Sequence, residues 1–127
     1  MRFDKKLVVI IRDNLLTWQK LNVTAFLMSS IGGTQNIIGQ PYVDGNQVSY
    51  LPMSQQPIMI YLASGEELNK EVKMITYTGG LFNTHNDEDD RSKVEEYPTD
   101  KLNLVGIDMF EKKNHVSKLI KGLKLHE

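Results

Sequence analysis

The chain has 127 residues, the size of one domain, with 40% hydrophobic and 24% charged residues. It contains no cysteine, which excludes disulfide bonds, thiolate metal ligands and cysteine nucleophiles. Fifteen Lys and Arg balance sixteen Asp and Glu, so the chain lacks the overall positive field that steers nucleic acid. A nucleic-acid partner is left open but is not indicated by charge.

The N-terminal residues carry no pattern of a signal peptide, because residues 1–4 lead straight into an apolar strand pattern. The longest uninterrupted apolar run, Leu7–Ile11, is far shorter than the roughly 20 residues that span a bilayer. No linker or repeat interrupts the chain. We therefore expect a single domain over residues 1–127, cytoplasmic and without a membrane partner.

Residues 5–11 form a β-branched run that is typical of a strand buried on both faces. Asp13 and Asn14 follow as turn or N-cap residues. The pattern then predicts a helix from Leu15 or Trp18 to Ser30, with Gly32 and Gly33 as its C-terminal stop.

Residues 34–56 are rich in Pro, Gly, Gln and Asn, which indicates loop and hairpin. Asp44-Gly45 stands between short apolar segments and predicts a β-hairpin over residues 41–50. Its edge offers backbone groups to another subunit, so a homo-oligomer is one alternative. Residues 57–62 predict a second buried strand.

The second half alternates short helices and strands. A capping box at residues 64–67 opens a short helix, and residues 74–78 predict a strand. Asn86 caps an acidic helix over residues 87–96, and residues 102–110 predict a long apolar strand. Asn114 caps a last helix whose apolar residues, at spacings of three, four and seven, are Val116, Leu119, Ile120 and Leu123.

This order predicts an α/β fold: a three-layer domain with a mixed, mostly parallel sheet and helices on both faces. In such sheets ligands bind outside the carboxyl ends of the strands, where helix N-termini present free N–H groups. Arg12 and Asp13 follow the first strand at that place. Trp18, Leu21, Asn22, Ala25 and Ser29 share one helical stripe. Asn22 and Trp18 either face a ligand or belong to the packed core, with the Asn22 amide hydrogen-bonded there.

Thr84-His85-Asn86 is a second candidate site, since a histidine acts as acid, base or ligand near neutral pH. The alternative is a turn and helix cap with a solvated His85. The acidic residues that follow lack the spacing of a calcium loop, and the macrodipole of a helix explains them, so no metal is expected. Phosphate-loop and dinucleotide motifs are absent, so no cofactor is expected either.

Four lysines of the last predicted helix could form a basic stripe for RNA, or simply its solvated face: Lys113, Lys118, Lys121 and Lys124.

Several segments are similar to an uncharacterised bacterial family, the domain of unknown function numbered two-thousand. They are the stretch from Lys6 to Ala25, Gly39-Gln-Pro-Tyr-Val-Asp44, the strand after Pro57, and Phe82-Asn-Thr-His-Asn86. The likeness runs over nearly the whole chain. That family in turn resembles type II peptidyl-tRNA hydrolases in fold, which implies a small mixed sheet with helices on both faces. Of the Lys-Gly-Lys-x-Ala-Ala-Gln signature of those enzymes, only a lysine at Lys20 has a counterpart here.

Two functions follow as hypotheses. As a binding module, the chain holds a small ligand or a nucleotide end above the first strand: Trp18 stacks, Arg12 pairs with an anion, and Asn22, Thr84 and Asn86 fix orientation. As a hydrolase implied by the resemblance, it uses Lys20 to stabilise negative charge, and His85 or Asp13 to move a proton. An interaction role without catalysis is the third alternative.

Overall fold

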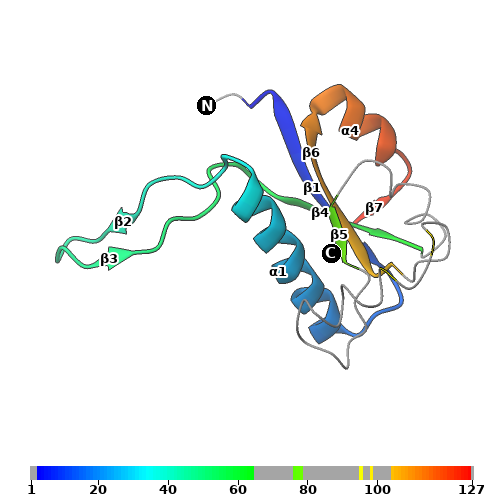
Figure 1. Ribbon diagram of the computed structural model, residues 1–127, viewed down its shortest axis with the longest axis horizontal. Coiled ribbons are helices and arrows are strands. Elements are labelled where there is room, and N and C mark those ends of the chain that lie inside the picture. The colour runs from blue at the N-terminus through cyan, green and yellow to red at the C-terminus, as the bar shows by residue number, and fades with distance from the viewer. Residues whose placement is uncertain (1–2, 65–75, 79–94, 96–97, 99–103, 127) are drawn as a thin grey trace.

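The computed structural model describes residues 3–64, 76–78, 95, 98 and 104–126. Apart from residues 64 and 95, the short helix predicted after the capping box at residues 64–67 and the helix predicted over residues 87–96 lie outside these residues. Thr84, His85 and Asn86 lie outside them as well. The protein is mixed α/β, with a five-stranded sheet, two described helices and a separate hairpin (Figure 1). In the described part of the chain, no helix is both long and apolar enough to cross a membrane.

The sheet has the strand order β5-β6-β1-β4-β7. Its strands are β1 (Lys5–Arg12), β4 (Met59–Ala63), β5 (Thr76–Thr78), β6 (Gly106–Lys112) and β7 (Lys124–Leu125). β1 and β4 are parallel, whereas the β1–β6, β5–β6 and β4–β7 pairs are antiparallel. The prediction of a mixed sheet is confirmed. The prediction that the sheet is mostly parallel is wrong for the described strands, because only the β1–β4 pair is parallel. A strand covered on both faces looks the same in sequence whichever way its neighbours run.

β1 is the centre of the sheet, and the residues Leu7–Ile11 are at most 1% exposed. Val8 and Ile10 belong to the cluster that contains residues of the C-terminal helix, whereas Val9 and Ile11 pack with the N-terminal helix. Because alternate side chains point to opposite faces, both helix layers are needed to cover this strand. The unbroken apolar run is thereby explained, and the predicted strand is confirmed.

The helix α1 (Thr17–Thr34) packs on the sheet through Val23, Leu27 and Ile31, four residues apart. Its first turn is closed by Gln19, whose Oε1 accepts a hydrogen bond of 2.9 Å from the Leu16 N–H. The predicted stop at Gly32 and Gly33 is wrong, because the helix runs through both. Neither glycine has the positive φ of a helix-ending residue, a value that Gly122 adopts elsewhere.

The stripe that starts at Trp18 does not pack on the sheet. Trp18 is 51% exposed and Leu21 and Ala25 are also exposed, so Trp18 is not a core residue. The helix carries two apolar stripes, and their spacing is equally regular. The stripe that turns inward is the one whose Val23 and Leu27 lie against Gly106 of the sheet.

Gly106 lets α1 approach β6 closely. A Cβ atom at this position would lie 2.6 Å from Val23 Cγ1 and 2.9 Å from Leu27 Cδ1. Contacts this short do not occur, so an added side chain would force Val23 and Leu27 of α1 to shift. β6 begins here, later than the predicted start at Leu102, although Leu104 and Val105 before it are buried.

The helix α4 (Lys113–Leu119) covers the other face of the sheet. Val116 and Ile120 are buried and Leu119 and Leu123 pack beside them, as their spacing predicts. The predicted cap at Asn114 is wrong, because β6 continues directly into the helix and Asn114 lies in its first turn. Lys124 is not on the helix either. It follows the turn at Gly122 and begins β7, a strand that was not predicted.

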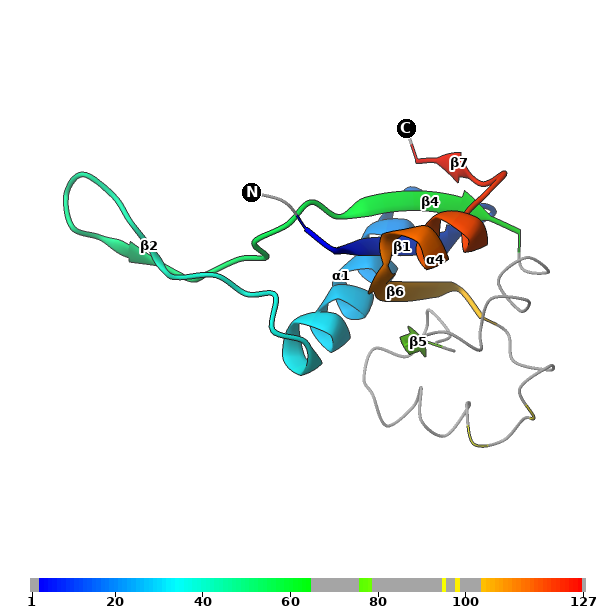
Figure 2. The ribbon, with the colours of Figure 1, turned by 90° about the horizontal axis from the view of Figure 1, so that it is seen from above.

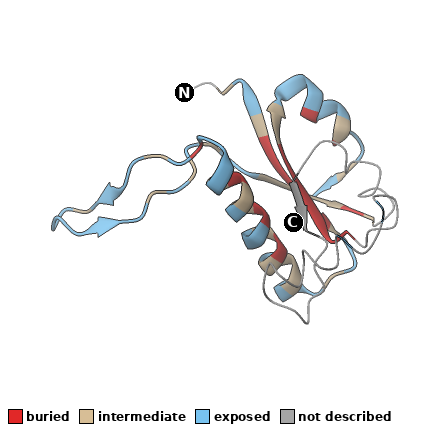
Figure 3. Ribbon diagram, viewed as in Figure 1, coloured by how far each residue is buried: buried red, intermediate tan, exposed pale blue. Residues whose placement is uncertain are grey.

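The predicted hairpin is confirmed as a separate two-stranded sheet of β2 (Tyr42–Val43) and β3 (Ser49–Tyr50). Residues 39–53, called the arm from here on, extend away from the rest of the protein in both views (Figures 1 and 2). The Asp44 carboxylate organises the tip by accepting hydrogen bonds from the Asn46 and Val48 N–H groups and the Tyr50 hydroxyl. Buried residues concentrate in the sheet and the inner face of α1, and the arm is exposed (Figure 3).

Candidate functional site

A cavity of about 260 Å³ lies where α1 crosses β1 and β4. Its floor is Ile11 of β1 and Ile60 of β4, and one wall is the side of α1. The described lining residues from the helix and the chain end are Lys20, Leu21, Thr24, Ala25, Met28 and His126. The lining is mostly hydrocarbon, so the cavity suits an apolar body of small size.

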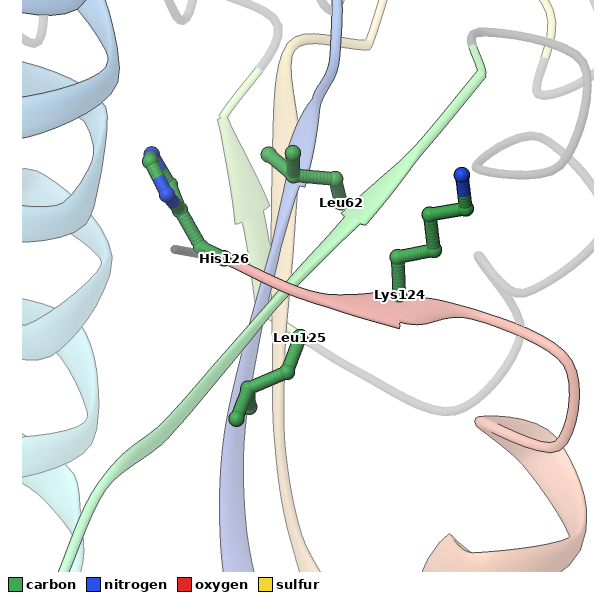
Figure 4. A pocket seen from close by; sticks show the side chains of 4 residues that line it. All are labelled: Leu62, Lys124, Leu125 and His126. Carbon is green, nitrogen blue, oxygen red and sulfur yellow. The ribbon is translucent and has the colours of Figure 1, made fainter.

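A second, wider hollow of about 600 Å³ lies beside the last strand. Its described lining is Leu62 of β4 together with Lys124, Leu125 and His126 (Figure 4). His126 lines both hollows, and its side chain lies toward α1, whereas the Lys124 side chain extends from the other end of β7. The two hollows are therefore neighbours, with the imidazole between them. We call them together the groove.

β7 holds the chain end in this position. Lys124 pairs with Leu62 in the antiparallel register, and the His126 N–H donates a hydrogen bond of 2.8 Å to the Ile60 carbonyl. Residues two apart on a strand point to the same face, which places Lys124 and His126 on one side and Leu125 on the other. The two-residue strand β7 therefore positions the Lys124 ammonium group and the His126 imidazole on the same side of the chain end.

Lys20 reaches the cavity from the first turns of α1. Its backbone N–H bonds to the Leu16 carbonyl at 3.0 Å, and its carbonyl accepts the Thr24 hydroxyl at 2.8 Å. The Thr24 hydroxyl is therefore used within the helix, which leaves its methyl group as apolar lining. Lys20 is the one charged residue in the sequence of this helix. Lys20 and Lys124 supply positive charge at a largely apolar groove.

The carboxyl end of β1 is fixed beside the groove by backbone and guanidinium bonds. The Arg12 N–H donates to the Val105 carbonyl and the Asp13 N–H to the Ala63 carbonyl, both at 2.9 Å. Arg12 Nη1 also donates to the Leu104 carbonyl at 3.1 Å. Arg12 therefore joins β1 to the segment that enters β6.

Of the residues predicted for the site, Lys20 lines the cavity. Arg12, Asp13, Trp18 and Asn22 are not among the described lining residues. Asp13 and Trp18 are exposed, and Asn22 is half-buried. Thr84, His85 and Asn86 lie outside the described residues.

Sequence reasoning missed His126 and named Lys124 only as part of a possible basic stripe, because the last residues were assigned to the end of a helix. The alternation of Leu123, Lys124, Leu125 and His126 is a weak strand signal that could have found them. It was obscured by the stronger helical spacing before Gly122.

Asp108 was also missed, inside a strand predicted to be apolar. Its side chain is fully buried, and its Oδ2 accepts a hydrogen bond of 3.2 Å from the Ser30 hydroxyl of α1. Burial raises the pKa of Asp108 to about 7, against a lowering effect of the Ser30 hydroxyl. The other oxygen, Oδ1, has no hydrogen-bond partner within the described structure. A carboxyl group in this position is a cost to folding above neutral pH.

The described part of the chain holds no cluster of three or more His, Asp or Glu side chains placed to bind a metal ion. The groove itself contributes one imidazole and no described carboxylate. Its chemistry is that of an apolar lining with basic groups at its border.

Comparison with known proteins gives a family without an assigned activity. A solved structure of a protein of unknown function from Agrobacterium tumefaciens is 40% identical in sequence, with a TM-score of 0.87. The match covers 99% of this chain and 100% of that one. No curated protein matches. Residues 5–127 match the family described as "Protein of unknown function (DUF2000)", and the chain belongs to that family.

Proposed function

We propose that the protein binds a small anionic molecule with an apolar body in the groove between α1, β4 and β7. The observation that carries this proposal is the combination of an apolar cavity of about 260 Å³ with Lys20 on its wall. His126 and Lys124 continue the basic border into the adjoining hollow. A carboxylate or phosphate fits these groups, and a short acyl chain or a single ring fits the cavity.

The place of the groove supports this proposal. Ile60 pairs in register with Val9, two residues before Ile11 on the parallel strand β1, so the cavity lies on the face of the sheet and extends toward the carboxyl end of β1 at Ile11. Ligands of α/β sheets bind at that edge because helix N-termini and loops converge there. Lys20, near the N-terminus of α1, adds a formal charge to the partial positive charge of the helix end.

A matched pair of ligands tests the proposal. Octanoate and octanol share an apolar chain and differ in the anionic group, so calorimetric titration of both separates the two contributions. Octanoate should bind at least about tenfold more tightly than octanol. Lys20→Met keeps most of the apolar stem and should remove that difference, whereas Lys118→Met, an exposed lysine on the opposite face, should keep it. Equal binding of both ligands by the native chain would contradict the proposal.

A hydrolase is the second candidate, because Lys20 lines the cavity and is the counterpart of a signature lysine in type II peptidyl-tRNA hydrolases. We propose that the chain shares their three-layer architecture as one cytoplasmic domain, which α1 and α4 on opposite faces of the sheet support. In this proposal Lys20 stabilises negative charge while Asp13 or His85 moves a proton.

Turnover of purified peptidyl-tRNA by the native chain beside Lys20→Ala is the test of this second candidate. Release of free tRNA that disappears in the variant supports it. A folded native chain that leaves peptidyl-tRNA intact removes it and leaves the binding proposal unaffected.

A further inference from the structure

The arm exposes a row of large apolar side chains. Leu51 is 87% exposed, and the others are each half-exposed or more. They are Tyr42, Val43, Val48, Tyr50 and Met53, with exposures from 49% to 62%. Tyr42 and Tyr50 pair across the two strands and share one face of the hairpin, and Val43 points to the other, so both faces of the arm carry exposed apolar groups. Exposed apolar groups in such number mark an interaction site.

The arm does not fold back onto the sheet or onto α1 of its own chain (Figures 1 and 2). It is closed at its base by the Gly39 N–H, which donates to the Met53 carbonyl at 2.9 Å, and by the Ile38–Ser54 bridge. Beyond that base it extends away from the sheet in both views (Figures 1 and 2). An isolated two-stranded hairpin is at best marginally stable in water. Whatever covers these side chains therefore comes from another molecule.

The charges of the arm narrow the class of partner. Residues 36–56 contain no Lys or Arg. Their one acidic residue, Asp44, accepts hydrogen bonds from the Asn46 N–H and the Tyr50 hydroxyl within the tip of the hairpin. Nucleic acid and anionic membranes are recognised through basic residues, which this segment lacks. An uncharged apolar surface of a protein is the chemistry that matches.

The same chain carries such a surface on the outward face of α1. Trp18 and Phe26 are exposed there, at 51% and 42%, whereas Leu21 and Ala25 line the cavity. Lys20, the helix's one charged residue, lies toward the cavity and not on this face. An exposed helix normally carries charged residues on its outer side. The outward face of this helix instead carries no charged residue, and its exposed large side chains are Trp18 and Phe26.

We propose that two copies of this chain form a dimer in which each arm lies on the outward face of the partner's α1. In a dimer with a two-fold axis, the arm of each copy contacts α1 of the other copy. The arm and the outward face of α1 are then covered in both copies. Tyr42, Tyr50, Trp18 and Phe26 alone offer roughly 100 Å² of exposed surface each, about half of the ~800 Å² per partner in a standard interface. The aliphatic residues of both surfaces supply the remainder.

Molar mass measured by sedimentation over a range of protein concentrations tests the dimer, and Trp18 tests where the arm lies. The chain has a single tryptophan, so its emission reports this face alone. The native chain should sediment as a dimer, with Trp18 emission shifted to shorter wavelength at concentrations where the dimer forms. In one variant the arm is shortened by joining Gln40 to Pro52 through Asn-Gly. This chain should stay monomeric, and its Trp18 emission should stay at long wavelength at every concentration.

Leu51→Glu provides a second variant that keeps the arm, and because Leu51 is 87% exposed we expect its replacement to leave the fold intact. It should raise the dimer dissociation constant about 100-fold. Ser117→Glu, an equal change of charge on exposed α4, should leave it unchanged. A monomeric native chain at about 100 μM overturns the proposal, as does a dimer that persists without the arm. A dimer whose formation leaves Trp18 emission unchanged overturns the contact with α1.

Discussion

The strand β1 and the arm are both rich in apolar residues, yet one is buried and the other is exposed. In β1 the residues Leu7–Ile11 are at most 1% exposed, because two helix layers and two neighbouring strands surround them. In the arm Leu51 is 87% exposed, because two strands of two residues each have no layer above or below them. Apolar composition therefore does not by itself decide burial. The number of layers that the chain can place on a segment does.

The largest expected effect comes from removing apolar volume in the first of these regions. Ile10→Ala leaves a cavity between β1 and α4 and should lower the free energy of unfolding by about 4 kcal/mol. Leu51→Ala removes a similar side chain from the arm and should cost less than about 0.5 kcal/mol in dilute protein. Denaturant unfolding of both variants measures the difference. Equal costs would show that the arm belongs to the folded core.

A smaller effect is expected at Asp108, the buried carboxyl group of the same core. Its pKa is raised to about 7 from an unfolded value near 3.9, so the folded chain keeps a proton that the unfolded chain has lost. The free energy of unfolding should therefore fall as pH rises from about 4 to about 7, and level off above that.

Asp108→Asn should remove this decline and unfold with a free energy about 3 kcal/mol higher than the native chain at pH 8. The gain is somewhat below the full linkage value, because a buried amide also costs free energy where its hydrogen bonds are not all made, as at Oδ1 of Asp108. Unfolding titrations at pH 4 and pH 8 check it. A native chain whose stability is the same at both values would refute the assignment.

Gly106→Ala should destabilise the fold by about 2 kcal/mol, because the added methyl group meets Val23 and Leu27 of α1. Gly45→Ala in the arm is the matched control, since a Cβ atom at that position would have no neighbouring atom within 4 Å. Thermal unfolding should separate the two variants clearly. A Gly106→Ala chain as stable as the control would mean that α1 packs less closely than described.

The smallest effect is expected at the tip of the arm, where Gln47 has a φ of 66°. A glycine adopts this left-handed conformation without the steric cost of a side chain. Gln47→Gly should therefore stabilise the hairpin by about 1 kcal/mol and slow hydrogen exchange at Asp44 N–H, which donates to the Val48 carbonyl. Exchange at β1 should not change. Faster exchange at Asp44 would contradict this explanation of the turn.

The sequence was sufficient for those elements whose pattern has one structural solution. The β-branched run predicted β1, Asp44-Gly45 predicted the hairpin, and the spacing of Val116, Leu119 and Ile120 predicted the buried side of α4. In each case a local rule and the tertiary packing agree.

It was insufficient where two solutions share one pattern. The two stripes of α1 have equal periodicity, and contact with Gly106 selects the one at Val23. The antiparallel direction of β6 relative to β1 cannot be predicted from the residues of either strand. β7 is too short for a reliable signal, so the position of His126 depends on its hydrogen bond to Ile60 and could not be read locally. Of the candidate site, Lys20 alone was predicted among the residues that line the groove.

The proposed groove is tested most directly by backbone amide chemical shifts, measured by NMR while octanoate is titrated into the native chain. We expect shifts that saturate together at Lys20, Thr24, Ile60 and His126, with the arm amides of residues 42–50 unchanged. Saturating shifts in the arm without shifts at Lys20 and His126 would place the ligand in a different region and contradict the proposed groove.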